Sequence, residues 1–169
     1  MRTEIYWIET PTPGRLAIMP RPRGGDWLED EIGSWRHSGI HVVLSLLTPG
    51  EVNDLDLAQE KALSEAKCIQ FLSFPIEDRG TPASGESMQR LLSELLKHLA
   101  EGRNVGIHCR QGIGRAPLVA ISVLLMAGLE RQTAKQRVST ARGVAVPETV
   151  QQDQWIAAFA KDALVSAPH

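Results

Sequence analysis

The sequence has little of what holds a small extracellular domain together. Only two cysteines, Cys68 and Cys109, occur among its 169 residues, and two cysteines cannot form a disulfide framework. A chain of this length can bury roughly 68–70% of the surface that its unfolded state exposes, so its core needs no disulfide bonds for stability. We therefore expect reduced thiols and a cytoplasmic location.

Long apolar runs and an excess of charge are absent as well. The longest apolar stretch, 118–129, is much shorter than the roughly 20 residues of a membrane-spanning helix. Residues 1–8 mix charges and contain no apolar run, which argues against a secretory leader or an anchor. A net charge of −2 gives no general attraction to nucleic acids or anionic membranes. We expect no membrane insertion and no nucleic-acid partner, so any bound anion must be held by a local arrangement of donors.

Histidine is sparse, and its spacing predicts no metal centre. His37, His41, His98 and His169 form no pattern typical of metal ligands. We therefore expect neither a metal nor another cofactor.

The sequence does contain alternating helical and strand patterns. From residue 26 onward these patterns follow one another without a linker. This order predicts an α/β fold, in which a central and mainly parallel sheet is flanked by helices. We expect one domain over 1–169 with a core of about 26–162, and strands at 40–47, 68–76 and 105–108.

Capping residues mark where helices begin. Asp26 is expected to cap a helix that Gly39 ends, and Thr48 with Glu51 predicts a capping box for the next helix, which extends with a break to Ala66. Further helices are expected at 87–101, at 116–127, from a capping box of Thr133 and Gln136 to about Gly143, and from about Glu148.

The segment 105–127 carries the strongest chemical signal, because a loop rich in glycine lies between a short strand and a helix. The loop reads Cys109-Arg110-Gln111-Gly112-Ile113-Gly114-Arg115. Its two glycines permit backbone conformations that turn amides inward, and the following helix adds its unsatisfied donors. Arg115 supplies a planar fork for two phosphate oxygens. The residues from Arg110 to Arg115 are therefore predicted to bind a phosphate group.

Cys109 stands at the start of this loop. A thiol among inward-pointing donors favours its thiolate form, and the thiolate is the nucleophile. The alternative is a buried strand residue, since free cysteines are commonly buried. Two glycines at fixed offsets, together with Arg115 and the strand-helix context, favour the nucleophile.

His108 and Cys109, followed by five residues and Arg115, resemble the signature of the protein tyrosine phosphatase superfamily. The short chain is similar to the dual-specificity branch, and the segment 75–82 with Arg142-Gly143 resembles the kinase-associated phosphatase type over about 27–159. The resemblance implies a phosphatase that hydrolyses phosphotyrosine, phosphoserine or phosphothreonine in proteins. It also implies a phosphocysteine intermediate on Cys109, with the phosphate held by Arg115.

The same resemblance implies two further site residues. Asp78, in the loop after the strand expected at 68–76, takes the place of the general acid, and Glu77 is the weaker candidate. Gln152 best matches a glutamine that positions water, while Glu148 stands where the first glutamine of that pattern falls.

The residue after the arginine departs from the family pattern. The family usually has serine or threonine there, and this chain has Ala116. The missing hydroxyl would assist the sulfur as it leaves phosphorus. The phosphatases of regenerating liver are similar in having Gly-Arg-Ala-Pro, and this similarity implies slow turnover.

Other readings of the sequence stay open. A phosphoinositide or other small-molecule phosphatase is one alternative, although only Arg110 could supply the extra positive charge. A low-turnover module that binds phosphate is another. Persulfide chemistry of the rhodanese type is a third, against which the length of the loop and Asp78 argue. Cys68 is expected to pack inside its strand rather than to pair with Cys109.

Overall fold

Five strands form the centre of the molecule, in the order β1-β2-β5-β3-β4. The structure is a computed structural model that describes residues 4–166, so residues 1–3 of the amino-terminal stretch considered above lie outside it. The first pair of strands is antiparallel and the other three pairs are parallel, which confirms the predicted sheet. The strands are β1 (Tyr6–Ile8), β2 (Leu16–Met19), β3 (Val42–Ser45), β4 (Gln70–Ser73) and β5 (Val105–His108).

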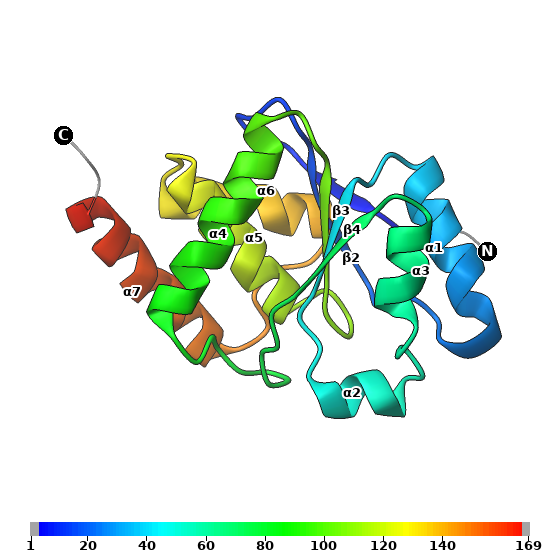
Figure 1. Cartoon of the computed structure of the whole chain (residues 1–169). Coiled ribbons are helices and arrows are strands. Elements are labelled where there is room, and N and C mark those ends of the chain that lie inside the picture. Colours follow the sequence, from blue (N-terminus) through cyan, green and yellow to red (C-terminus); the bar gives the residue numbers. More distant parts are fainter. Residues whose placement is uncertain (1–3, 167–169) are drawn as a thin grey trace.

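Helices cover both faces of this sheet (Figure 1). On one side lie α1 (Leu28–His37) and α3 (Glu60–Ala66). On the other side lie α4 (Gly85–Ala100), α5 (Arg115–Met126), α6 (Arg131–Arg142) and α7 (Val150–Ser166). Within residues 4–166, no helix combines the length and the apolar character needed to cross a bilayer.

Strand side chains alternate between two hydrophobic cores, one under each layer of helices. Ile18, Leu44 and Ile107 belong to the core that includes α4 and α5. Met19 and Val43 belong to the core that includes α1. Every residue of β2, β3 and β5 is buried, as expected for parallel strands that are covered on both faces. The packing therefore fixes the central strand β5 and the loop that follows it.

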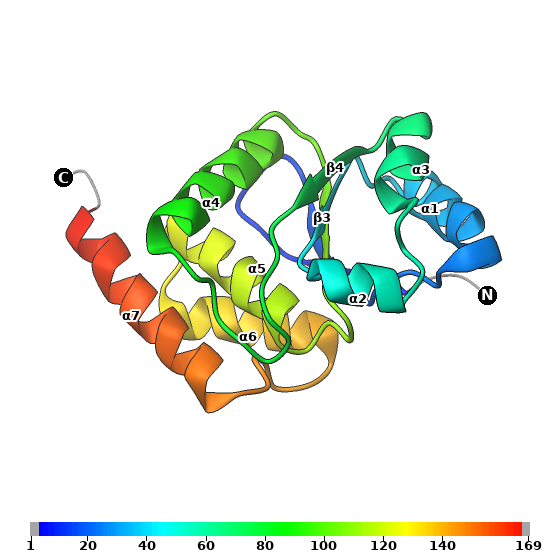
Figure 2. The same cartoon turned by 60° about the horizontal axis from the view of Figure 1, so that its bottom comes forward.

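The carboxyl ends of β3, β4 and β5 meet at one edge of the sheet, where open α/β folds bind their ligands. The short helix α2 (Pro49–Asp54) follows β3 at this edge. Figure 2 brings this end of the molecule forward and shows α2 near the segments that follow β4 and β5. Three segments that are distant in the sequence therefore come together here.

Two strands come from residues that precede the expected core of 26–162. β2 is fully buried and pairs with the central strand, with Ile18 opposite Ile107, so the sheet extends beyond that core. β1 and β2 have only three and four residues, and prolines and glycines surround them. Strands this short show too few alternating positions to be recognised from the sequence.

Several helix starts differ from the prediction. Thr48 and Glu51 form the predicted capping box, and α2 and α3 confirm the break in the helical stretch that follows. Asp26 does not cap α1, because it lies within a 3-10 turn, Gly25–Trp27, that precedes the helix. Thr133 lies inside α6, which begins at Arg131 without a side-chain cap.

The start of α7 carries a capping box that the sequence analysis missed. The Gln152 amide donates to the Thr149 hydroxyl at 3.1 Å, and the Thr149 amide donates to the Gln152 side chain at 3.3 Å. The helix therefore begins at Val150, slightly later than expected.

Cys68 lies outside the strand in which it was expected to pack. β4 begins at Gln70, and Cys68 is exposed in the turn after α3. Its φ of 62° is left-handed, which is incompatible with an extended strand. The apolar run that predicted the strand continues into this turn, because Ile69 is buried there.

Candidate active site

Cys109 follows β5 directly and is 3% exposed. The Gly112 amide donates to its Sγ atom at 3.3 Å, as expected for a loop whose amides turn inward. Gly112 has a φ of 79°, a left-handed conformation that glycine adopts without the cost that a side chain imposes. The loop therefore places a backbone donor on the sulfur.

Arg142, the last residue of α6, holds this loop from outside. Its Nε donates to the Gly112 carbonyl and its Nη2 donates to the Gln111 carbonyl, both at 3.1 Å. The guanidinium also lies over the Tyr6 ring, 4.4 Å from its centroid, in a cation-π contact. These contacts keep two loop carbonyls turned away from the sulfur. From the sequence, Arg142 was notable only as part of a family resemblance, which implies no role for it.

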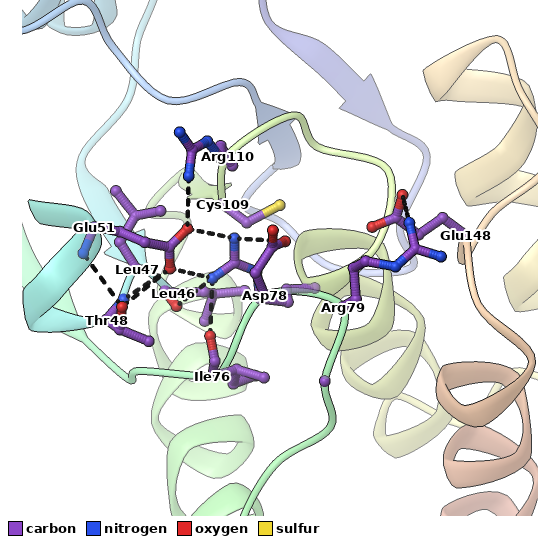
Figure 3. A network of polar contacts seen from close by, with 12 residues as sticks. Leu46, Leu47, Thr48, Glu51, Ile76, Asp78, Arg79, Cys109, Arg110 and Glu148 are labelled. Atoms are coloured by element: carbon purple, nitrogen blue, oxygen red, sulfur yellow. Dashed lines mark hydrogen bonds and ion pairs between the residues drawn. The ribbon is translucent and has the colours of Figure 1, made fainter. Parts of the chain in front are cut away.

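Arg115 is the first residue of α5 and is 2% exposed. Its guanidinium donates to both carboxylate oxygens of Glu51, at 2.6 and 2.9 Å, and to the Ile76 carbonyl at 2.8 Å. It also donates to Asp78 Oδ1 at 3.2 Å. Figure 3 shows Glu51, Asp78 and Ile76 gathered around this network beside Cys109. A planar group with so many partners has a fixed orientation.

Glu51 is a site residue that the sequence analysis recognised only as a helix cap. Its Oε1 accepts a hydrogen bond from the Thr48 amide, at 3.1 Å, while the same carboxylate binds Arg115. Burial alone raises the pKa of the Glu51 carboxyl, but the hydrogen bonds from Arg115 and Thr48 outweigh it, so that this pKa lies below its ordinary value. Burial alone lowers the pKa of Arg115, but Glu51, Cys109 and Asp78 raise it overall.

Replacing Glu51 with glutamine should lower the free energy of unfolding by about 3 kcal/mol, because a buried charge loses its main partner. Urea denaturation measures this loss. A carboxyl with a lowered pKa stabilises the fold fully above its unfolded value of 4.5, and this contribution disappears as the pH falls through the folded value. The difference between the two proteins should therefore be constant near neutral pH and shrink below about pH 4.5.

The matched control for this variant is Glu86→Gln. Glu86 lies 3.6 Å from Arg90 on an exposed helix face, where such a pair contributes about 0.3–0.5 kcal/mol. A loss as small in Glu51→Gln as in this control would show that Arg115 does not depend on Glu51.

Asp78 lies in the loop after β4, and its side chain is 54% exposed. Its carboxylate faces the guanidinium of Arg115, and it lines the same cavity as Cys109. The Ile76 amide donates to the Leu46 carbonyl at 3.0 Å, which ties this loop to the chain after β3. The structure therefore brings together the three residues predicted to carry the chemistry.

A buried pair lies behind the loop. His108 Nε2 is 2.6 Å from Glu60 Oε2, and both residues are buried. The Trp35 ring packs on the imidazole at a centroid distance of 5.8 Å. His108 is thus anchored behind the loop by Glu60 of α3, a partner that no spacing in the sequence predicts.

Gln152, in the first turn of α7, and Glu148, just before this helix, differ in whether they line the cavity. Gln152 is fully buried and donates from its side chain to the Gly80 carbonyl at 3.1 Å, and its side-chain oxygen accepts from Thr149. Glu148 lines the cavity and lies 3.6 Å from Arg79. The polar side chain that faces the cavity from this segment is therefore Glu148, and the water-positioning role of Gln152 stays a prediction.

A cavity of about 120 Å³ lies over the loop. Since one water molecule requires about 10–15 Å³, this space is large enough for a phosphate group and the first atoms of its ester. Of the predicted phosphate-binding residues, Gly112 alone is not part of the lining. Among residues 4–166, no three side chains of metal-binding type gather into a metal site. The cavity is lined by Asp78, Arg79, Cys109, Arg110, Gln111, Ile113, Gly114, Arg115 and Glu148.

The chain is similar to a known protein in sequence and to solved structures in fold. The chain is 31% identical to cyclin-dependent kinase inhibitor 3 of Rattus norvegicus over 126 residues, which are 73% of this chain and 59% of that protein. The chain thus spans little more than half the length of this relative. Its fold matches kinase-associated phosphatase carrying serine at its catalytic cysteine, with a TM-score of 0.89, 22% identity and 99% of each chain covered. It also matches PTPMT1 in complex with PI(5)P, with a TM-score of 0.76, 14% identity and 96% and 99% covered.

One family model covers almost the whole chain. Residues 4–160 match the family described as Swiss Army Knife protein, DSP-PTPase phosphatase domain. This match confirms the resemblance to the dual-specificity branch. The chain belongs to this family of DSP-PTPase phosphatase domains.

Proposed function

We propose that this protein hydrolyses phosphomonoesters of tyrosine, serine or threonine in proteins through a phosphocysteine intermediate on Cys109. One observation carries the proposal: Cys109, Arg115 and Asp78, which come from different parts of the chain, line a single cavity. A nucleophile, a bidentate phosphate ligand and a carboxyl group are the parts that phosphate-ester cleavage requires.

In the first step the Cys109 thiolate attacks phosphorus and the bond to the ester oxygen breaks. Asp78 gives its proton to the departing oxygen, which leaves as an alcohol or phenol. The inward amides of the loop and Arg115 stabilise the charge on the other phosphate oxygens. While it binds the phosphate, the Arg115 guanidinium keeps its buried hydrogen bonds to Glu51. The phosphate replaces weaker contacts of the same guanidinium.

In the second step water attacks phosphorus and the phosphorus-sulfur bond breaks. Asp78, now ionised, accepts a proton from that water, and the thiolate of Cys109 is restored. Phosphate then leaves the cavity, so that atoms and charges balance over the cycle.

The choice of a protein substrate is supported by the relatives and by the charges near the loop. Kinase-associated phosphatase is named for a protein partner. Arg110, the residue that could have served a phosphoinositide, lies 3.9 Å from Glu51 and is partly neutralised. We propose a cytoplasmic location as well, which two free cysteines and the need of the nucleophile for a reduced thiol support.

Hydrolysis of an aryl phosphate tests the proposal, followed by release of phosphate from phosphoproteins, phosphoinositides and nucleotides. We expect turnover of the aryl phosphate and the highest kcat/KM with phosphoproteins. Sulfur transfer from thiosulfate without phosphate release would overturn it in favour of rhodanese chemistry. Tight anion binding without any hydrolysis would show a binding module instead.

Replacing Ala116 with serine should raise turnover several-fold. Ala116 is fully buried in the first turn of α5 and cannot donate a hydrogen bond to the sulfur as it leaves phosphorus. A restored donor is worth at most about 2.7–4 kcal/mol, and less here because the loop amides share the sulfur. Rapid mixing with an aryl phosphate should show a burst in the parent protein and a smaller burst in the variant.

Ala120→Ser is the control for this prediction. It adds the same hydroxyl to the same buried helix one turn later, away from the sulfur. Equal gains in both variants, or no burst in the parent, would show that departure of the sulfur is not the slow step.

A further inference from the structure

Every arginine that lines the cavity is already paired with a carboxylate. Arg115 binds Glu51 and Asp78. Arg110 lies 3.9 Å from Glu51, and Arg79 lies 3.6 Å from Glu148. The phosphate under attack is held by the loop amides and Arg115. A second anion on the substrate finds no unpaired arginine in this lining.

The pair of Arg79 and Glu148 is not symmetrical with respect to the cavity. The Glu148 side chain is 21% exposed, whereas the Arg79 side chain is 65% exposed. Glu148 Oε1 lies only 2.8 Å from the position that a β-carbon on Gly114 would occupy, so the carboxylate lies against the phosphate loop itself. Figure 3 shows Arg79 and Glu148 together on the side of Asp78 that is remote from Glu51.

This asymmetry determines the sign of the charge that a substrate meets beside its phosphate. An exposed arginine is well solvated, so its field is weakened by water and salt. A carboxylate that is mostly withdrawn from water and rests on the loop acts at closer range and is less screened. The net field on this side of the cavity therefore favours a neutral or cationic group next to the phosphate and disfavours an anionic one.

We propose that Glu148 makes the cavity selective for phosphomonoesters that carry no second anionic group beside the phosphate to be removed. The preferred substrates are phosphorylated side chains with basic or neutral neighbours, and ligands with clustered phosphates are poor substrates. This inference rests on the proposed function, since it names the substrate class of the same site.

Two phosphopeptides that differ only in the residue after the phosphorylated position test the inference, one with lysine and one with glutamate. We expect kcat/KM to be about tenfold higher for the lysine peptide, which corresponds to about 1.4 kcal/mol. Glu148→Gln should bring the ratio close to one, mainly by improving the glutamate peptide. The preference of the parent should weaken as salt is raised, since it arises from charge.

Arg79→Gln separates a role in selectivity from a role in loop structure. It breaks the same ion pair from the other end but leaves the Glu148 charge in place, so the preference for lysine should increase. Asp153→Asn removes one negative charge from the same segment of chain, where Asp153 pairs with Lys135 and does not line the cavity. It should leave the ratio unchanged.

The outcomes distinguish this inference from the proposed function. If the parent hydrolyses neither peptide nor an aryl phosphate, the proposed function fails. If it hydrolyses both peptides and the two ion-pair variants shift the ratio in the same direction, Glu148 acts only by holding the loop of Asp78 and the inference fails alone. A ratio that does not respond to Glu148→Gln overturns it as well.

Discussion

Cys109→Ser should abolish turnover while the loop still binds phosphate-like anions. The serine hydroxyl is a far weaker nucleophile than a thiolate, so no covalent intermediate forms. The loop amides and Arg115 remain, and both belong to the anion site rather than to the nucleophile. Activity on an aryl phosphate should therefore be lost, whereas the affinity for vanadate or sulfate, measured by calorimetry, should be kept.

Cys68→Ser is the matched control, because Cys68 is the other free cysteine and is exposed away from the loop. It should keep the activity of the parent protein. More than a small residual fraction of activity in Cys109→Ser would rule out the covalent mechanism. Loss of activity in both variants would indicate an effect on the fold, which thermal unfolding would reveal.

Asp78→Asn should slow the hydrolysis of phosphoserine-type substrates by roughly 10²–10⁴, the usual contribution of a positioned acid. An amide cannot give a proton to the departing oxygen, and an alkoxide is a poor leaving group. An activated aryl phosphate should lose much less, because its leaving group needs no proton. Steady-state kinetics with the two substrates measures this difference.

Glu77→Gln is the control for Asp78, since Glu77 is adjacent, exposed and not part of the cavity lining. It should leave both rates nearly unchanged. Equal losses with both substrates in Asp78→Asn would mean that Asp78 orients Arg115, which it contacts at 3.2 Å, rather than donating a proton. A larger loss of rate in Glu77→Gln than in Asp78→Asn would indicate that Glu77 is the general acid.

The phosphate loop could be predicted from the sequence because all of its parts are local. Cys109, the two glycines and Arg115 lie within seven consecutive residues, and their geometry follows from a strand, a turn and a helix start. Asp78 could be predicted as well, but only through the resemblance to a family, since a carboxylate in a polar loop is common. The structure brings Cys109, Arg115 and Asp78 into one cavity.

The residues that hold these groups in place could not be predicted in the same way. Glu51 had a complete local explanation as a helix cap, and its second role toward Arg115 depends on how α2 is placed near the first residue of α5. Glu60 and Arg142 are ordinary charged helix residues until packing places them against His108 and the loop carbonyls. No spacing in the sequence encodes contacts of this kind.

By itself, the sequence predicted the α/β class, which the sheet confirms, and it predicted Cys109 as the nucleophile, because hydrophobic periodicity and a short glycine-rich loop are properties of neighbouring residues. Only the tertiary structure decided that two short strands before residue 26 complete the sheet and that Cys68 is exposed. It also decided that Glu148 rather than Gln152 faces the cavity. The physical reason is that burial, ion pairs and cavity lining depend on which distant segments meet at the carboxyl edge of the sheet, and that meeting is set by packing of the whole fold.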